Sequence, residues 1–226
     1  MSGQLLDNPV WHALGGPHIP LRQDFGPVRR YRPDVALFAA FEAPAAEPLD
    51  GLIAAIPEAG GAALVTPAPV DVPAGLSAMR VLPVLQMVAA TPRPVAPATD
   101  AIDLGDEHVP QMLELVQLTQ PGPFAARTIE MGRYIGIMEG DALVAMAGER
   151  MRLPGYTEVS AVCTHPDHRG RGHAKRLVST LLHDITGRRE TAFLHVLPDN
   201  RAAITAYEAL GFTGRREMTF TAFARA

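Results

Sequence analysis

Residues 169–174 form a short segment rich in arginine and glycine, with the sequence Arg-Gly-Arg-Gly-His-Ala. An apolar, strand-like run from Thr157 to Cys163 precedes it, and a helical spacing of apolar residues begins at Leu177. Glycines adopt turn conformations that other residues avoid, and the N-terminus of a helix presents unpaired N–H groups that favour an anion. Because Arg169 and Arg171 add positive charge, the segment predicts a phosphate site. The alternative is a tight turn whose glycines serve packing alone.

The kind of phosphate ligand is not fixed by these features. A dinucleotide fingerprint needs a third glycine in the spacing G-x-G-x-x-G, and a P-loop ends in Gly-Lys-Ser or Gly-Lys-Thr. Residues 169–176 contain neither pattern. The segment therefore predicts an anion site that belongs to neither of these two nucleotide-binding motifs.

The spacing of Arg169, Gly172 and Ala174 resembles the signature of the GNAT acetyltransferase superfamily: Gln or Arg, two residues, Gly, one residue, Gly or Ala. The resemblance includes the preceding residues 162–168. A second segment downstream is similar to the family pattern N-x-x-A-x-x-x-Y-x-x-x-G-F. Its matching residues are Asn200, Ala203, Tyr207, Gly211 and Phe212. Together the two motifs cover residues 100 to 226 and leave the first hundred residues unassigned.

The resemblance implies acetyl-CoA as the co-substrate and no metal. In the family, the strand before the glycine turn separates from its neighbour and pairs with the pantetheine arm, while the turn binds the pyrophosphate. Asn200 would hydrogen-bond the pantetheine. The cofactor-binding residues predicted by the resemblance are Val162, Cys163, Thr164, Arg169, Gly170, Arg171, Gly172, His173, Ala174, Asn200 and Ala203.

Acetyl transfer to an amine needs a group that accepts a proton and a group that protonates the leaving thiolate. Tyr207 resembles the general acid of the family; the alternative is a tyrosine that only covers the core. Glu158 lies eleven residues before Arg169, the spacing of the glutamate that serves as base in some members. The alternative for Glu158 is a solvated carboxylate on a strand. Glu149 is a weaker candidate for the base.

The cluster of Cys163, His165, His168 and His173 also allows a zinc hypothesis, but no second pair of ligands with the usual spacing accompanies it. A nucleophilic role for Cys163 is another alternative. Its place in an apolar strand favours a packed, unreactive thiol.

Charge and composition limit the classes of partner. The formal net charge is −4, so we expect no nucleic acid, although residues 168–176 are locally basic. The chain has one cysteine, no signal-peptide pattern at residues 1–7 and no apolar run long enough to span a membrane. We therefore expect a cytoplasmic protein without membrane contact, either a monomer or a homodimer, whose partners are acetyl-CoA and an amine acceptor.

The distribution of proline divides the chain. Of the 21 prolines, 15 lie in the first 100 residues, and the alternating prolines of residues 91–99 are typical of an extended linker. We therefore expect a short-pieced N-terminal α/β region over residues 1–95 and a second domain over residues 98–226. The N-terminal region is expected to contain a helix at Asp50–Ile56, a strand at Ala62–Val65, and an apolar stretch at Met79–Ala90 broken at Pro83.

The second domain has clearer periodicity. Its expected helices are Glu107–Gln120, Gly172–Thr186 and Arg201–Leu210, and its expected strands are Tyr134–Met138, Ala142–Met151, Thr157–Cys163, Thr191–Val196 and Glu217–Phe223. The first three of these strands are predicted to form an antiparallel meander. The expected class is mixed α/β (α+β), and the resemblance implies the GNAT acyl-CoA N-acyltransferase fold.

The resulting functional hypothesis is an acetyltransferase that moves an acetyl group from acetyl-CoA to a primary amine of a small molecule or peptide by direct attack. The alternative is a GNAT-fold module that binds acyl-CoA for regulation without turnover. The N-terminal region lacks a counterpart of the arginine-glycine turn. It is therefore interpreted as a degenerate GNAT-like half that forms one wall of the acceptor site, and not as a second catalytic centre.

Overall fold

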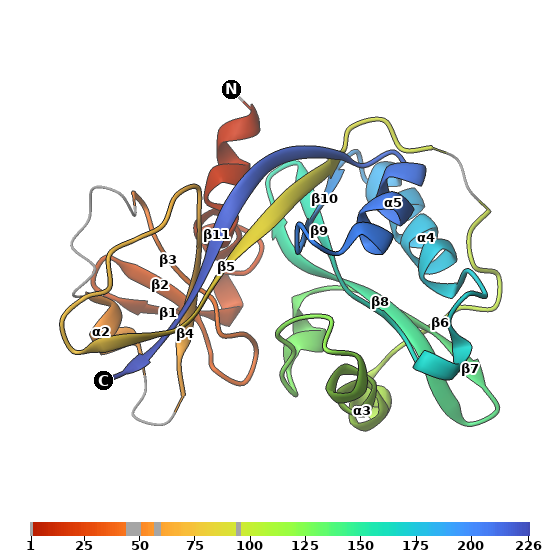
Figure 1. The fold of residues 1–226 in the computed structure, drawn as a ribbon, viewed down its shortest axis with the longest axis horizontal. Helices are drawn as coiled ribbons and strands as arrows, with labels where there is room; N and C mark the ends of the chain where they lie inside the picture. The colour runs from red at the N-terminus through yellow and green to blue at the C-terminus, as the bar shows by residue number, and fades with distance from the viewer. Residues whose placement is uncertain (1, 44–50, 57–59, 94–95) are drawn as a thin grey trace.

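A computed structural model describes residues 2–43, 51–56, 60–93 and 96–226 (Figure 1). The described strands form a three-stranded sheet, β1-β2-β3, and an eight-stranded sheet in the order β4-β11-β5-β10-β9-β8-β7-β6. Helices cover both faces of the larger sheet on its β7–β10 side (Figure 1). The expected mixed α/β class is confirmed.

The C-terminal part of the larger sheet contains the predicted meander. Its strands pair antiparallel: β6 with β7, β7 with β8, and β8 with β9. Gly140 takes a φ of +59° in the β7–β8 turn, and Gly155 takes a φ of +79° in the β8–β9 turn. The strand bounds are β6 Ile102–Asp103, β7 Tyr134–Glu139, β8 Ala142–Leu153 and β9 Tyr156–Thr164.

Two layers of helices enclose this part of the sheet. Helix α4 (His173–Gly187) packs Leu177, Val178 and Leu181 into the main core beneath the strands, and α5 (Arg201–Ala209) adds Ile204. Helix α3 (Val109–Thr119) packs on the opposite face through Met112 and Leu115 (Figure 1). The amphipathic spacing that predicted these helices therefore corresponds to their buried stripes.

The N-terminal elements are short, as the prolines predicted, but they include a small sheet that the sequence did not indicate. Strands β1 and β2 form a hairpin across Gly26 and Pro27, and β3 pairs antiparallel with β2. The predicted helix and strand are present, although Asp50 lies outside the described residues. The bounds are α1 Pro9–Leu14, β1 Arg22–Phe25, β2 Val28–Tyr31, β3 Ala39–Phe41, α2 Gly51–Ala55 and β4 Ala62–Thr66.

Pro83 does not break the strand in which it lies. Strand β5 (Leu76–Ala89) runs through it and pairs antiparallel with β11 (Thr213–Arg225), Pro83 facing Thr219. Strand β10 (Thr191–Val196) pairs with β5 only over residues 85–89. Pro83 therefore lies where β5 has a ladder on one side only, a position that tolerates a missing N–H.

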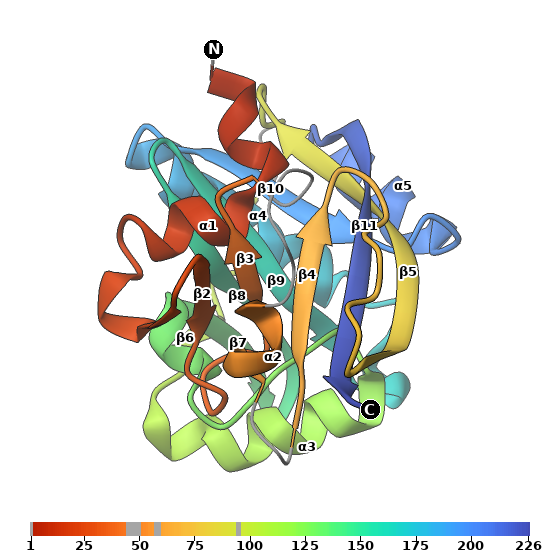
Figure 2. The ribbon, with the colours of Figure 1, turned by 90° about the vertical axis from the view of Figure 1, so that its left-hand side faces the viewer.

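The larger sheet crosses the predicted boundary at residues 91–99. Strand β5 lies between β10 and β11, and β4 pairs with β11 on its other side. Figure 2 shows β4, β11 and β5 side by side in front of the C-terminal strands. Of the linker, residues 94–95 lie outside the described residues, and Arg93 N donates to Leu210 O. The division into residues 1–95 and 98–226 stays a prediction.

Each half of the molecule contains two strands that run parallel and are connected through a helix. In the C-terminal half these are β9, α4 and β10, and in the N-terminal half β3, α2 and β4. In the N-terminal half the parallel contact is one bridge, Phe38 with Ala63. The correspondence agrees with a diverged GNAT-like half, which remains an interpretation.

Among the helices that the structure describes, none combines the length and apolar character needed to cross a membrane.

Candidate active site

Strands β9 and β10 separate after three residues of parallel pairing. Tyr156, Thr157 and Glu158 face Thr191, Ala192 and Phe193, and no further pair follows although both strands continue. From Val159 to Thr164, β9 keeps its partner β8 on one side only. Among the described residues no strand pairs with this other side, so its backbone groups up to Cys163 can pair with an extended ligand.

A β-bulge marks the point of separation. The register with β8 shifts between Gly148–Ser160 and Met146–Cys163, and Ala161 takes a φ of +51°. Bulges redirect side chains and occur next to active sites. The predicted pantetheine-binding residues Val162, Cys163 and Thr164 lie directly after this bulge.

The arginine-glycine segment connects the end of β9 to the start of α4. Gly170 and Gly172 both take a φ of +77°, a conformation that favours glycine, and Gly172 is the N-cap of the helix. No side chain among the described residues caps this helix N-terminus. The first N–H groups of a fifteen-residue helix therefore remain available to an anion.

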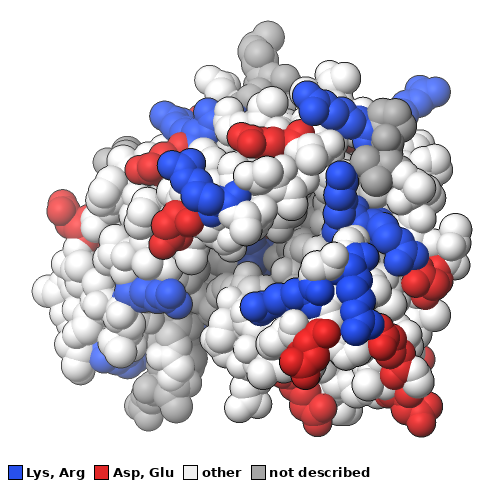
Figure 3. All heavy atoms as spheres, turned by 45° about the vertical axis from the view of Figure 1, so that its right-hand side comes forward, with Lys and Arg blue, Asp and Glu red and all other residues white. Residues whose placement is uncertain are grey.

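Charged side chains surround this segment. Arg171 Nη1 lies 2.7 Å from Glu139 Oε1, and His168 Nδ1 lies 3.0 Å from the same oxygen. Arg169 Nε donates to Thr164 O at 3.4 Å. Both ring nitrogens of His173 are buried without a hydrogen-bond partner among the described residues. Figure 3 shows lysine and arginine side chains gathered beside a hollow in this face of the molecule, as suits an anionic ligand.

Helix α5 places the residues of the second motif. Asn200 is its N-cap, and its Oδ1 accepts a hydrogen bond from Ala203 N at 3.2 Å. Tyr207 lies one turn beyond Ala203, and both pack against the main core. The Tyr207 ring meets Phe212 edge to face at 5.7 Å. Burial, together with the nearby Cys163, raises the pKa of Tyr207 to about 12, so its hydroxyl is a protonated donor at neutral pH.

Cys163 has the environment of an unreactive thiol. It is 6% exposed and belongs to a cluster with Met112 and Leu115 of α3. Burial raises the pKa of the thiol to about 11, despite a hydrogen bond with Thr119. A thiolate is therefore scarce at neutral pH, which disfavours the nucleophilic alternative.

Glu158 is fully buried in an ion pair. Its two carboxylate oxygens accept hydrogen bonds from Arg150 Nε and Nη2 at 2.8 and 2.7 Å. Burial raises the pKa of this carboxyl, but the charge and hydrogen bonds of Arg150 and a bond from His195 outweigh burial and lower the pKa to about 2. A carboxylate of such low pKa is a poor proton acceptor. The solvated-carboxylate alternative is wrong because the side chain is 0% exposed, and the role as base stays a prediction.

Sequence reasoning missed the partners of Glu158. His195 Nδ1 lies 2.7 Å from Glu158 Oε1, and Gln86 Nε2 lies 3.0 Å from His195 Nε2. The imidazole of His195 therefore lies between the carboxylate of Glu158 and the side-chain amide of Gln86. Arg150 also stacks over the Phe38 ring at 4.8 Å. Together with Glu158, these residues come from five strands or their flanks, and no local spacing relates them.

The weaker candidate for the base, Glu149, is also ion-paired. Its Oε1 lies 2.8 Å from Arg188 Nη2, near the C-terminal end of α4. It borders a cleft of about 430 Å³ that is also lined by His18, Leu21, Arg133 and Arg152. The N-terminal residues 17–21 thus share this cleft with the C-terminal half.

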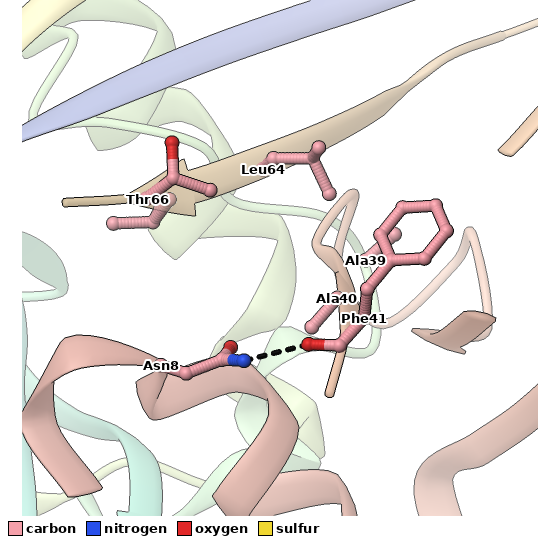
Figure 4. Close-up of a pocket in the computed structure, with 7 residues that line it drawn as sticks. Asn8, Ala39, Ala40, Phe41, Leu64 and Thr66 are labelled. Carbon is pink, nitrogen blue, oxygen red and sulfur yellow. Dashed lines mark hydrogen bonds between the residues drawn. The ribbon is translucent and has the colours of Figure 1, made fainter. Parts of the chain in front are cut away.

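The parting between β3 and β4 is filled by the chain itself. Asn8 Nδ2 donates to Phe41 O at 2.6 Å and to Glu42 O at 3.2 Å. Figure 4 shows this side chain directed at the end of β3, with Leu64 and Thr66 of β4 across from it. In this half, therefore, a side chain from the N-terminal segment hydrogen-bonds the backbone at the end of β3.

The chain is similar to known acetyltransferases. The FR47-like protein family matches residues 134–221. The N-alpha-acetyltransferase RimI of Mycobacterium tuberculosis is 35% identical over 99 residues, and an uncharacterized protein of Mycobacterium leprae is 36% identical over 101 residues. Each alignment covers 41% of this chain, and it covers 61% of the first relative and 27% of the second. The match therefore spans less than two thirds of these curated relatives.

Solved structures extend the similarity to the whole chain. A structure from Kribbella flavida, named a GCN5-related N-acetyltransferase, shares the fold at 18% identity, with a TM-score of 0.60 and coverage of 96% and 93% of the two chains. A structure from Novosphingobium aromaticivorans, assigned to the GNAT acetyltransferases, is 42% identical and covers 98% of both chains, with a TM-score of 0.91. From this full-length similarity, which includes the N-terminal half, we conclude that the chain belongs to the GNAT family of acetyltransferases.

Proposed function

We propose that the protein transfers an acetyl group from acetyl-CoA to a primary amine by direct attack of the amine on the thioester. The observation that supports this proposal is the combination of three features in one part of the molecule. These are the uncapped helix start at Gly172, the edge of β9 from Val159 to Thr164 that has no strand partner among the described residues, and the partly buried Tyr207 beside Cys163. They suit a pyrophosphate, an amide-containing arm and a leaving sulfur respectively.

The proposed reaction balances without a metal or redox partner. The amine nitrogen bonds to the acetyl carbon, the carbon–sulfur bond breaks, and the thiolate takes a proton from Tyr207. The attacking nitrogen loses one proton, which returns the tyrosinate to its neutral form through solvent. The products are an N-acetyl amine and the thiol of CoA.

For Glu158 we propose an indirect role in this reaction. Its ion pair with Arg150 and its contact with His195 hold three side chains beside the parting of β9 and β10. Accepting a proton would leave the buried Arg150 without its counter-charge, which is costly. Glu158 therefore fixes the local charge and the orientation of His195, and the amine proton leaves by water.

The acceptor proposed for the first tests is the terminal amine of a peptide. The support is the relative named an N-alpha-acetyltransferase, which matches this chain over the C-terminal half. The N-terminal half supplies Phe38 over Arg150 and residues 17–21 along the cleft, so we propose it as one wall of the acceptor site.

The test is transfer of labelled acetyl from acetyl-CoA to a panel of amines. The panel holds a peptide with a free N-terminus, the same peptide blocked at the N-terminus with one free lysine, and spermidine, with products identified by mass spectrometry. Acetylation of any member supports the proposal. Tight acetyl-CoA binding without turnover on any amine would instead favour the regulatory binding module.

A further inference from the structure

Tyr134, at the start of β7, lies across the neighbouring strand. Its register partner on β8 is Gly148, and Gly148 in turn faces Ser160 on β9. A Cβ atom at Gly148 would lie only 2.1 Å from Cδ1 of the Tyr134 ring. The ring therefore occupies the space above this glycine, which explains why position 148 excludes a side chain.

The ring reaches toward the point where β9 leaves β10. Tyr134 shares a cluster with Met146, Ala161 and Cys163, the residues around the β-bulge, and Phe124 packs edge-on against it at 5.6 Å. The separation of β9 from β10 begins at Val159, and Ser160, which faces Gly148, and Ala161 of the bulge follow it directly. Tyr134 thus forms part of the wall beside the site proposed for the thioester.

The hydroxyl of Tyr134 has no hydrogen-bond partner among the described residues. The residue is 1% exposed, and Oη is fully buried. Burial raises the pKa of this hydroxyl, and the charges of Arg150 and Glu158 act on it in opposite directions. An unpaired buried hydroxyl is unfavourable, so it calls for a ligand or a function.

We propose that Tyr134 Oη accepts a hydrogen bond from an N–H of the attacking amine. This inference rests on the proposed function. During attack the nitrogen lone pair points at the acetyl carbon, so its N–H bonds point away and need acceptors. A neutral tyrosine hydroxyl can accept such a bond without protonating the amine. The reaction itself is unchanged: nitrogen bonds to carbon, sulfur leaves, and Tyr207 protonates the sulfur.

Tyr134 thereby selects the amine substrate by hydrogen bonding and not by charge. The neighbouring Arg150 and Glu158 neutralise each other at 2.7 Å. No net charge therefore holds an ammonium group at this wall, and the site favours the uncharged amine that the reaction requires. Tyr134 is accordingly an acceptor-binding residue, distinct from the predicted cofactor-binding set.

The test compares Tyr134→Phe with Tyr31→Phe. Both tyrosines are buried, but the Tyr31 hydroxyl already lies 2.9 Å from His18 Nδ1. For Tyr134→Phe we expect kcat/KM for the amine to fall about 10-fold, as the loss of one hydrogen bond predicts. The KM for acetyl-CoA should stay unchanged, and the thermal midpoint should not fall. Tyr31→Phe removes a buried hydroxyl that already has a partner, so it should lower the midpoint, and it should lower kcat/KM for the amine less than Tyr134→Phe does.

The amines tested are the peptide with a free N-terminus, the blocked peptide with one free lysine, and spermidine. If Tyr134→Phe is unstable, Tyr134→Met serves as a second variant without the hydroxyl. A wild-type protein that acetylates none of them contradicts the proposed function. A wild type that is active, with Tyr134 variants of equal kcat/KM, contradicts the role of Tyr134 alone. A rise in the KM for acetyl-CoA by the same factor would also overturn it, since the defect would then be in cofactor binding.

Discussion

At the scale of single residues, the buried charges beside the parting of β9 and β10 determine what the site can do. Glu158 and Arg150 hold each other in a bidentate pair, and His195 contacts the same carboxylate. Such a pair fixes geometry at a desolvation cost, and losing one partner is more damaging than losing both. The pair therefore gives the site a fixed, neutral environment and makes Glu158 important for stability.

The first prediction concerns Glu158→Gln. Arg150 and His195 lower the folded-state pKa from 4.5 to about 2 despite burial, so the ion pair stabilises the fold at pH values above 4.5. This contribution is lost as the pH falls from 4.5 toward 2. We expect the variant to lose about 3 kcal/mol of unfolding free energy at pH 7, and the difference from wild type to shrink below pH 4.5.

Urea unfolding at pH 7 and between pH 4.5 and 2.5 provides the measurement. The control is Glu190→Gln, because Glu190 also pairs with an arginine, Arg152, but its side chain is 12% exposed. A smaller loss is expected there. If the loss of unfolding free energy in Glu158→Gln is the same at every pH, packing and not charge explains the effect.

At the scale of elements, the sequence predicted those features that depend only on residues close together in the chain. The cofactor segment was recognisable because Arg169, Gly172 and Ala174 follow one another in a fixed spacing, and the structure adds that Gly170 and Gly172 have positive φ. Helices α3, α4 and α5 followed from their apolar periodicity. The remaining elements depend on pairing between segments that are distant in the sequence. Strands β1 to β3 contain only three to four residues each, too few to show a detectable pattern.

The same limit explains the site. Tyr134 and Gly148 become partners only through the register of β7 and β8. Arg150, Glu158 and His195 meet through three strands, and Gln86 joins from β5 across the predicted domain boundary. Sequence spacing could propose Glu158 as a base, but it could not reveal the arginine that lowers its pKa.

The second prediction concerns the turn that begins α4. Gly172→Val forces a β-branched residue into a φ of +77°, so the turn must change shape and its N–H groups must move away from the pyrophosphate. We expect acetyl-CoA affinity to fall by about 100-fold or more, a loss of ~3 kcal/mol. Isothermal titration calorimetry measures it directly.

Gly155→Val is the matched control. Gly155 has a φ of +79° and lies in the β8–β9 turn, and at Gly155, as at Gly172, an added Cβ would have no neighbouring atom within 4 Å. The two variants should lose similar stability through backbone strain. If Gly155→Val also loses acetyl-CoA affinity, strain alone explains the effect and the turn has no special role.

At the scale of the whole molecule, one sheet unites the two halves. Strand β5 supplies the ladder between β10 and β11, so the C-terminal half cannot complete its sheet without residues 76–89. The gap between β3 and β4 and the gap between β9 and β10 then differ in what occupies them. One is closed by Asn8, and the other keeps the unpaired edge of β9 beside the uncapped start of α4.

The third prediction follows from this continuity. We expect a single cooperative thermal transition, with calorimetric and van't Hoff enthalpies in agreement, because neither half retains its strand partners when the other unfolds. Saturating acetyl-CoA should move the whole transition upward, by about 2.7 kcal/mol at 100 times its Kd. Two transitions, only one of them shifted by acetyl-CoA, would mean that residues 1–95 and 98–226 unfold as separate domains.

The central claim is that amine attack releases CoA from this site with Tyr207 as the proton donor. The most direct measurement is the rate of amine-dependent CoA thiol release by the wild type and by Tyr207→Phe, with acetyl-CoA affinity measured on the same samples. We predict a fall in kcat of about 100-fold or more, because general acid catalysis contributes at least that much, with little change in acetyl-CoA affinity. Full activity in Tyr207→Phe would contradict the claim.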